Sequence, residues 1–239
     1  MGFFYLKEES MSKIEIEEIR PFGPMIGKFS LDDDVVESLN KTCDLILENN
    51  LEKALDNSQT LAGKVRQEIK IPVEILQAHG QYFSDMFVKY VKSVNKHGKE
   101  MPGEQANDIF KGREYNLGSN IKSGWFVRSF AGDYNPAHMH PNCMMSCAGF
   151  LKVPDWEEEL AADADDHYGL THGCLSFLFG DVAALSITNH TVRPRVGDIY
   201  IFPGWLRHVV YPFRSSGERR SFSLNVDAAV LKDKTDSNN

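Results

Sequence analysis

Short apolar or alternating runs separated by turn residues fill the second half of the chain, and they constrain the fold more than any other feature. Runs of this length bounded by Gly, Pro, Asn and Asp are typical of β-strands. Many consecutive short strands close into a barrel or into two packed sheets. We therefore predict a two-sheet jelly-roll, the double-stranded β-helix, as the core. The runs are residues 125–130, 146–153, 174–179, 183–188, 198–202, 208–213 and 221–226.

Two stretches in the first half of the chain carry apolar residues at helical spacing. The first begins at the acidic cluster 32–34, whose negative charges suit the positive end of a helix dipole. The second runs from about residue 73 to residue 96, with Pro72 in its first turn. His79 lies on its apolar stripe, and we interpret it as a packed core histidine rather than a metal ligand. Helices packed outside one sheet predict an α+β class that is mainly β with flanking helices.

The remaining segments complete a single predicted structural domain. Residues 14–31 mix β-branched residues with Pro and Gly, which indicates one or two short strands, and residues 97–120 have the composition of a loop. Residues 1–120 are then N-terminal strands and supporting helices, and residues 121–230 form the double-stranded β-helix core. Residues 231–239 are polar and are expected to be a mobile tail.

Composition narrows the class of protein and its partners. The chain has 239 residues, of which 42% are apolar, so it is able to bury a full core. The formal net charge of −8 and the lack of a basic run argue against nucleic acid as a partner. No stretch reaches the roughly 20 apolar residues that a membrane helix needs. Four cysteines are too few for a disulfide framework in a chain of this length, which favours a cytoplasmic location.

Three histidines in the predicted β half are candidate ligands of one metal ion. His138 and His140 are separated by a single residue, so on an extended backbone they project from the same face of a strand. His208 comes much later, in another apolar run bounded by turn residues. Neutral imidazole suits iron, copper, nickel and zinc, so the three histidines predict a mononuclear metal site without naming the metal. Arg219 follows downstream, and its planar guanidinium predicts an anion-binding group near the metal.

Two cysteines lie close to the histidine pair in the sequence. Cys143 and Cys147 could act as soft metal ligands, but their spacing is not Cys-x-x-Cys. Buried free cysteine is also a common core residue. We therefore interpret both as core residues.

The segment from residue 124 to residue 226 resembles the catalytic core of the 2-oxoglutarate- and Fe(II)-dependent oxygenases, in particular a branch known mostly from bacterial and phage genomes. The resemblance covers about a hundred residues, less than half of the chain, and its motifs are fairly specific when taken together. The matching stretches are Trp125, Gly132, and residues 138–142, 146–154, 197–203, 208–212 and 219–225.

The resemblance implies Fe(II) as the metal, 2-oxoglutarate as a co-substrate and O2 as the oxidant. It implies that His138 and His208 are iron ligands and that Arg219 pairs with the distal carboxylate of 2-oxoglutarate, with Ser221 beside it. Strand alternation puts Arg219 and Ser221 on one face and Arg220 on the other, which favours Arg219 as the carboxylate partner. The implied reaction hydroxylates a substrate and decarboxylates 2-oxoglutarate to succinate.

Position 140 departs from the family pattern, which has Asp two residues after the first His. Three arrangements are open: a three-histidine site, a two-histidine site completed by water, or a carboxylate from elsewhere such as Asp133. We favour three histidines, namely His138, His140 and His208. A neutral ligand in place of a charged one should weaken the binding of a cation and strengthen the hold on an anionic co-substrate.

Four further residues are candidates for the pocket wall and for groups that support the ligands. Trp125, Tyr134, Asn142 and Ser146 all lie near the predicted metal site in the sequence, and ordinary packing explains each of them equally well. The sequence leaves the prime substrate open between a small molecule and a peptide. Exposed sheet edges of a jelly-roll allow a homodimer.

Two other functions fit the same residues. Glycine and histidine spacings around Gly132 and Gly197 agree with parts of a cupin signature, although Met144 and Met145 stand where its glutamate is expected. Three-histidine sites of that kind occur in thiol dioxygenases, which need no 2-oxoglutarate, so Arg219 discriminates between the two enzymes. The third hypothesis is a non-enzymatic metal-binding jelly-roll. Structural zinc normally takes four protein ligands, and only three are evident.

Residues 155–166 form an acidic insertion. The simpler interpretation is a solvated surface loop. The alternative is a lid beside the pocket that prefers a basic or peptide-like substrate, because a rim of one charge steers ligands of the other.

Overall fold

The fold is described for residues 15–19, 23–58, 63–100, 117–163 and 171–230 of a computed structural model. The predicted tail at 231–239 and most of the predicted loop at 97–120 lie outside these residues. None of the helices in the described residues combines the length and the hydropathy that a transmembrane span requires.

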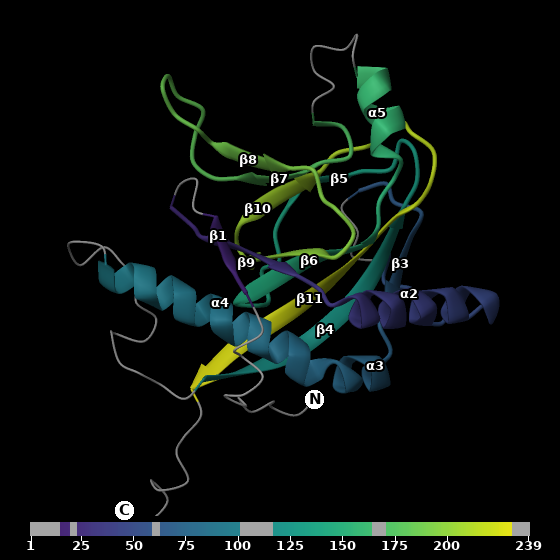
Figure 1. Cartoon of the computed structure of the whole chain (residues 1–239), viewed down its shortest axis with the longest axis horizontal. Coiled ribbons are helices and arrows are strands. Elements are labelled where there is room, and N and C mark those ends of the chain that lie inside the picture. Colours follow the sequence, from purple (N-terminus) through teal and green to yellow (C-terminus); the bar gives the residue numbers. More distant parts are fainter. Residues whose placement is uncertain (1–14, 20–22, 59–62, 101–116, 164–170, 231–239) are drawn as a thin grey trace, which may run out of the picture.

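Two antiparallel sheets form the double-stranded β-helix that the short runs predict (Figure 1). The larger sheet has the order β1-β2-β9-β6-β11-β4-β3, and the smaller has the order β5-β10-β7-β8. The predicted fold class is confirmed. The strands are β1 (Glu17–Ile19), β2 (Ile26–Ser30), β3 (Gln67–Lys70), β4 (Leu117–Ser129), β5 (Asn135–His138), β6 (Met145–Lys152), β7 (Leu175–Leu178), β8 (Asn189–Val192), β9 (Asp198–Pro203), β10 (Arg207–Val210) and β11 (Arg219–Val230).

The N-terminal strands extend the larger sheet at both edges. Strand β2 pairs with β9, and β3 pairs with β4. The predicted boundary at residue 121 falls inside β4, so the two predicted parts of the domain share one sheet.

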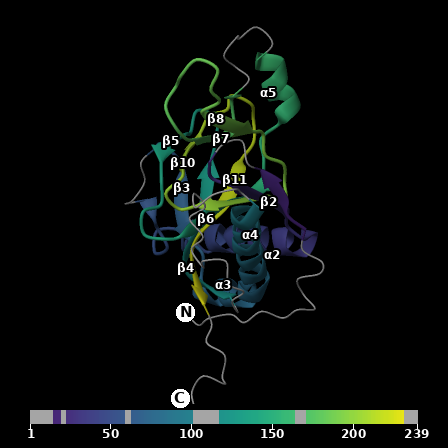
Figure 2. The same ribbon diagram turned by 90° about the vertical axis from the view of Figure 1, so that its left-hand side faces the viewer.

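Helices cover one face of the larger sheet. They are α2 (Asp33–Glu48), α3 (Val73–Ala78) and α4 (Gly80–Glu100), and they lie on the opposite side of β4 and β11 from the smaller sheet (Figure 1). The short helix α5 (Trp156–Asp163) lies apart from them at the other end of the molecule (Figure 2). The flanking helices are therefore packed outside one sheet, as expected.

The second predicted helix is two helices rather than one. Helix α3 ends at Ala78, His79 is its C-cap, and α4 begins at Gly80. A glycine at this point weakens the continuity of a helix. Pro72 is the residue before α3 rather than part of its first turn. His79 does not join the metal-ligand cluster; its Nε2 lies 2.9 Å from the Ser38 hydroxyl of α2.

The core has two parts, one on each face of the larger sheet. The part between sheet and helices includes Phe83, Phe87, Phe126 and Phe222. The part between the two sheets includes Phe150, Leu175, Phe177, Phe202 and Leu206. Successive side chains of a strand point to opposite faces, so β11 sends Phe222 to the helices and Ser221 toward the smaller sheet.

The predicted strand at 183–188 is wrong. This stretch connects β7 to β8, and β8 begins only at Asn189. Its apolar residues are exposed, with Leu185 fully accessible at a φ of 63°, so they have no sheet face to pack against. The short strand β3 was not predicted, because it does not form an apolar run. Strand β4 also starts at Leu117, inside the predicted loop, because residues 117–121 pair with the end of β11.

Candidate metal centre

Three histidines converge between the two sheets. His138 ends β5 and lies directly opposite His208 of β10 in the antiparallel ladder, with ring centroids 4.2 Å apart. The ring of His140 is nearly parallel to that of His208, at an interplanar angle of 8° and a centroid distance of 5.3 Å. The potential ligand atoms of the three residues all lie within 4.8 Å of one another. This spacing fits a single metal ion with imidazole ligands.

The position of His140 depends on a backbone contact rather than on the strand. The expectation that both histidines of the pair lie on one strand is wrong, because β5 ends at His138. The backbone N–H of His140 instead donates to the carbonyl of Gly204 at 2.8 Å. A Cβ at position 204 would lie 2.5 Å from the Cys143 carbonyl oxygen and 2.8 Å from that of His140. Only glycine allows this close approach.

Backbone carbonyls orient two of the three rings. Nδ1 of His138 lies 2.8 Å from the Pro136 carbonyl oxygen, and Nδ1 of His208 lies 3.1 Å from that of Leu206. A carbonyl only accepts, so in each ring Nδ1–H donates and the lone pair of Nε2 is available to a metal. The ring of His140 instead packs against Trp125, with centroids 5.7 Å apart.

The electrostatic surroundings keep all three imidazoles neutral. Burial lowers the pKa of His138 and lowers that of His208 well below the usual value. Burial, followed by the neighbouring His138, lowers the pKa of His140 to about 4. Metal binding requires the neutral form of histidine, so a divalent cation displaces no proton from these rings at neutral pH. The donor set therefore fits Fe(II).

Other proposed ligands stay outside the cluster. The Cys143 thiol donates to the His140 carbonyl at 3.6 Å, and burial raises the pKa of Cys147 to about 12, which disfavours the thiolate that binds metals. Asp133 accepts a hydrogen bond from the Phe130 N–H at 3.0 Å. Within the described part of the chain, the cluster contains histidines alone. Neither a cysteine ligand nor a carboxylate from Asp133 gains support.

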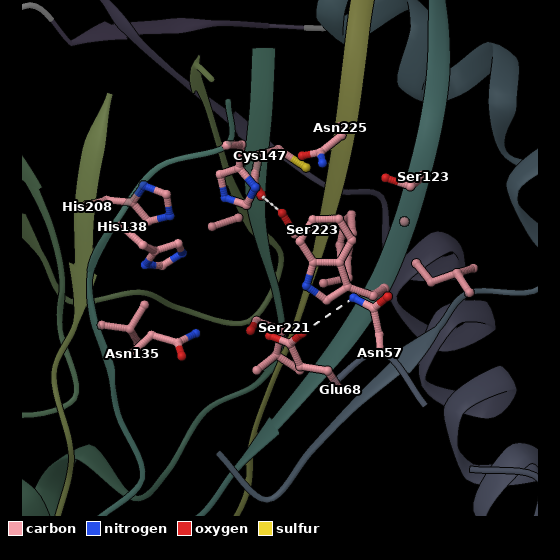
Figure 3. A pocket seen from close by; sticks show the side chains of 18 of the residues that line it. Asn57, Glu68, Ser123, Asn135, His138, Cys147, His208, Ser221, Ser223 and Asn225 are labelled. Carbon is pink, nitrogen blue, oxygen red and sulfur yellow. Dashed lines mark hydrogen bonds between the residues drawn. The ribbon is translucent and has the colours of Figure 1, made fainter. Parts of the chain in front are cut away.

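A cavity of about 650 Å³ joins the histidines to the inner face of the larger sheet (Figure 3). Trp125, Asn142, Arg219 and Ser221 line it together with the three histidines. This volume lies within the usual range for a small-molecule site, ~300–1,000 Å³.

Two predicted pocket residues lie elsewhere. Ser146 is fully buried in the sheet, where its hydroxyl donates to the Leu224 carbonyl at 3.1 Å, and it does not line the cavity. Tyr134 is 42% exposed, also lies outside the lining, and its backbone pairs with Lys64.

Arg219 is a buried cation on the cavity wall. Only 2% of it is exposed, and Nη1 donates to the carbonyls of Tyr211 at 3.0 Å and Gly173 at 3.2 Å. Among the described residues, no carboxylate lies within ion-pair distance of its guanidinium, and the buried Asp133 acts on it only from a greater distance. Burial lowers its pKa to about 10, so it stays charged at neutral pH. A buried charge is normally paired, and Arg219 is therefore suited to an anionic ligand.

The neighbouring Arg220 points to the helix face of the sheet. Its Nη2 donates to Asp44 at 2.7 Å and its Nε donates to Glu218 at 3.1 Å. Arg220 is thus neutralised by acids that belong to the fold, and it does not line the cavity.

Sequence reasoning missed Glu68 and Asn57 on the cavity wall. Glu68 lies on β3, is 7% exposed, and accepts a hydrogen bond of 3.4 Å from the Asn57 side-chain amide. No motif marks either residue. Only the pairing of β3 with β4 could have indicated that Glu68 faces the cavity, and β3 is too short and polar to be recognised as a strand.

The acidic insertion holds a neighbouring loop. Glu159 is fully buried on α5 and accepts hydrogen bonds from the backbone N–H groups of Arg214 at 2.8 Å and Ser215 at 2.7 Å. Glu158 accepts another from Ser216 at 2.8 Å. The expectation of a solvated loop is wrong for Glu159, which is buried on a helix, whereas Glu158 is exposed. None of residues 155–163 lines the cavity. Residues 164–166 lie outside the described residues.

These observations define a class of protein: a double-stranded β-helix whose cavity joins a three-histidine cluster to a buried arginine. Residues 123–225 match the model of a family described as "Putative 2OG-Fe(II) oxygenase". This matched segment contains the three histidines and Arg219. Over this segment the chain is similar to 2-oxoglutarate-dependent non-haem iron oxygenases, a family that uses Fe(II), 2-oxoglutarate and O2.

Solved structures extend the similarity beyond the matched segment. AviO1 from Streptomyces viridochromogenes Tue57 is 12% identical, with a TM-score of 0.50 over 84% of this chain and 88% of AviO1. A prolyl-4-hydroxylase from Pseudomonas putida is 17% identical, with a TM-score of 0.49 over 91% of this chain and 95% of that protein. None of the curated proteins matches the chain. At such low identity, the likeness to AviO1 shows a shared fold.

Proposed function

We propose that this protein hydroxylates a C–H bond of a small molecule or peptide while 2-oxoglutarate is decarboxylated to succinate. One oxygen atom of O2 enters the product as a hydroxyl group, the other enters succinate, and CO2 is released. The observation that carries this proposal is Arg219, a buried guanidinium without an acid partner among the described residues, on the wall of the cavity that holds the histidine cluster.

The histidine cluster would hold the metal. His138, His140 and His208 would be its ligands, and the carbonyls of Pro136 and Leu206 keep two of the rings in the required tautomer. Bound Fe(II) supplies the redox chemistry that couples O2 to the 2-oxo acid. Three neutral ligands leave the full positive charge of the ion in place, which favours a dianionic co-substrate.

Arg219 and Ser221 would fix the far end of 2-oxoglutarate. They follow one another on the cavity face of β11. The carbonyls of Tyr211 and Gly173 accept hydrogen bonds from one guanidinium nitrogen, Nη1. These bonds fix the orientation of the guanidinium group before the ligand binds. A carboxylate held by guanidinium and hydroxyl donors is oriented as well as bound.

Aromatic rings would keep water away from the ligands. Phe202 lies 4.8 Å and Phe177 lies 6.3 Å from the ring of His208, measured between centroids, and both are buried. Trp125 packs against His140 on the cavity side. A site shielded in this way strengthens electrostatic contacts and limits side reactions.

The test is an anaerobic titration of the protein with Fe(II) and then with 2-oxoglutarate, followed by the visible metal-to-ligand charge-transfer band. Arg219→Ala should raise the Kd for 2-oxoglutarate about 10- to 100-fold, because it removes hydrogen bonds to a charged group. Iron binding should be unchanged. Arg207→Ala is the matched control, since Arg207 is an exposed arginine on β10 that does not line the cavity.

The same titration separates the competing functions. Equal 2-oxoglutarate affinity in Arg219→Ala and the unchanged protein would favour a three-histidine dioxygenase that needs no 2-oxoglutarate. Failure of the protein to bind Fe(II) at all would remove both enzymes and leave a non-enzymatic jelly-roll.

A further inference from the structure

Glu68 faces the proposed catalytic cavity from the edge of the larger sheet. In the antiparallel register, Glu68 of β3 lies opposite Val127 of β4, and Val127 lies opposite Ser221 of β11. All three line the cavity, so they form one row across its wall. Figure 3 shows Glu68 and Asn57 on the side of the cavity away from His138 and His208, with Ser221 next to Glu68.

Glu68 has few polar contacts for a buried acid. Its side chain is bonded to the Asn57 amide at 3.4 Å, a long hydrogen bond. No lysine or arginine among the described residues lies within ion-pair distance of it. Lys70 lines the same cavity from the same strand, but its side chain is exposed. A buried carboxylate is normally paired with a cation, and the fold does not provide one within the described residues.

Glu68 is also the single carboxylate among the described residues that line the cavity. The other charged or titratable groups there are Lys70, Arg219, Cys147 and the three histidines. A negative charge at this position repels a dicarboxylate, so Glu68 would not bind 2-oxoglutarate itself, although it lies in one row with Ser221. It is suited to a cationic group of the prime substrate.

We propose that Glu68, positioned by Asn57, binds a cationic nitrogen of the prime substrate, so that the substrate class is an amine or a guanidine such as a lysine or arginine side chain. This inference rests on the proposed function and names the substrate class of that same site. Ammonium and guanidinium groups both complete the missing ion pair and both donate hydrogen bonds to a carboxylate.

The ionisation of Glu68 agrees with this role. Burial raises its pKa to about 7, against the opposing effect of the Asn57 hydrogen bond, and the nearby Asp56 adds to the rise. A bound cation favours the ionised form, so cation affinity should increase as the pH rises from 6 to 8. Lysine and arginine side chains stay protonated over that range, so the change would belong to the protein.

The experiment uses three probes that differ only in the side chain: N-acetyl-lysine N-methylamide, its arginine counterpart, and its norleucine counterpart, which lacks the charge. Their Kd values are measured by calorimetry at pH 8 on the full chain, both with Fe(II) and 2-oxoglutarate under anaerobic conditions and without them. We expect the lysine or the arginine probe to bind about tenfold or more tightly than the norleucine probe, the size of a charged hydrogen bond. This comparison needs no variant.

Glu68→Gln keeps the shape of the side chain and should abolish the preference. Asp56→Asn is the matched control, because Asp56 is an exposed acid beside β3 that does not line the cavity, and it should keep the preference. Thermal melts of both variants check folding.

Equal Kd values for charged and uncharged probes in the unchanged protein would overturn the proposal. So would a preference that survives in Glu68→Gln. These outcomes are independent of the proposed function, whose failure would appear as a missing charge-transfer band with Fe(II) and 2-oxoglutarate.

Discussion

Arg219 and Arg220 are neighbours on β11, and both are almost fully buried, yet their surroundings are opposite. On the helix face of the larger sheet, Arg220 contacts the acids Asp44 and Glu218. On the cavity face, Arg219 contacts backbone carbonyls and an aromatic ring, and no described acid pairs with it. One face of this sheet therefore completes its own ion pairs, whereas charged groups on the other face have no acid or base partner among the described residues.

The same contrast holds for two glutamates, the buried Glu68 and the partly buried Glu218. Glu218 accepts hydrogen bonds from Arg128 at 2.6 Å and Arg220 at 3.1 Å. Glu68 on the cavity face has one amide partner. Charged groups whose hydrogen bonds and ion pairs are completed within the fold stabilise it. Charged groups that lack such partners are candidates for function.

The largest expected effect is a difference between Arg219 and Arg220 in their contribution to the free energy of unfolding. Arg220→Ala should lower the free energy of unfolding by about 3 kcal/mol, because it leaves buried or half-buried acids without their partner. Arg219→Ala should change it by less than about 1 kcal/mol, since removing an unpaired buried charge also removes its desolvation cost. Urea denaturation of both variants measures the difference. Equal losses would show that Arg219 is as structural as its neighbour.

The same contrast between the two faces of the sheet should appear in iron binding, when His208 on the cavity side is compared with His79 on the helix side. His208→Ala should weaken Fe(II) binding by at least about 100-fold, more than the 10- to 100-fold typical for the loss of a group that merely supports a ligand. His79→Ala should leave Fe(II) affinity unchanged, because His79 contacts Ser38 on the helix side of the sheet. Anaerobic titration with Fe(II) measures both. Unchanged affinity in His208→Ala would contradict the proposed ligand set.

A smaller expected effect is that Glu68 and Glu218 change the stability of the fold with pH in opposite directions. Burial raises the pKa of Glu68 to about 7. The protonated form of Glu68 therefore favours the folded state, and this contribution to stability is lost as the pH rises from about 4.5 through 7. Burial acts against ionisation of Glu218 too, but hydrogen bonds from Arg128 and Arg220 keep its pKa below the usual value. Glu218 therefore contributes stability that is present at neutral pH and lost as the pH falls through that lowered pKa.

Glutamine substitutions should show these opposite signs. Relative to the unchanged protein, Glu68→Gln should gain roughly 1–2 kcal/mol between pH 5 and pH 8, after allowance for solvent screening. Glu218→Gln should be destabilised at pH 7 and approach the stability of the unchanged protein in acid. Denaturation curves at a series of pH values measure both, and parallel pH profiles would remove the contrast between the two faces.

Local patterns in the sequence predicted much of the β core and several site residues. Apolar runs indicated β6, β7, β9, β10 and β11, and the alternation along β11 separated Arg219 from Arg220 before their contacts were known. His138, His140 and His208 were identified as candidates from residue type and spacing, and the structure brings them together. The roles of these residues in metal and 2-oxoglutarate binding remain our proposals.

Errors arose where a local pattern competed with a distant contact. Residues 183–188 have the apolar content of a strand, but they find no partner strand and remain an exposed loop. Residues 117–120 have the composition of a loop, but the end of β11 offers them a full ladder of hydrogen bonds, so they continue β4. Pairing with a partner strand outweighed local propensity in both segments.

By itself the sequence determined which side chains share a strand face, because alternation follows from backbone geometry and requires no knowledge of the neighbouring strands. Which faces meet depends on the packing of the two sheets. The tertiary structure placed His140 through the Gly204 carbonyl rather than through a strand, and it brought Glu68 from a short polar edge strand to the wall of the cavity. Such contacts join residues far apart in the chain, and their energies exist only after the sheets have formed, so no local pattern encodes them.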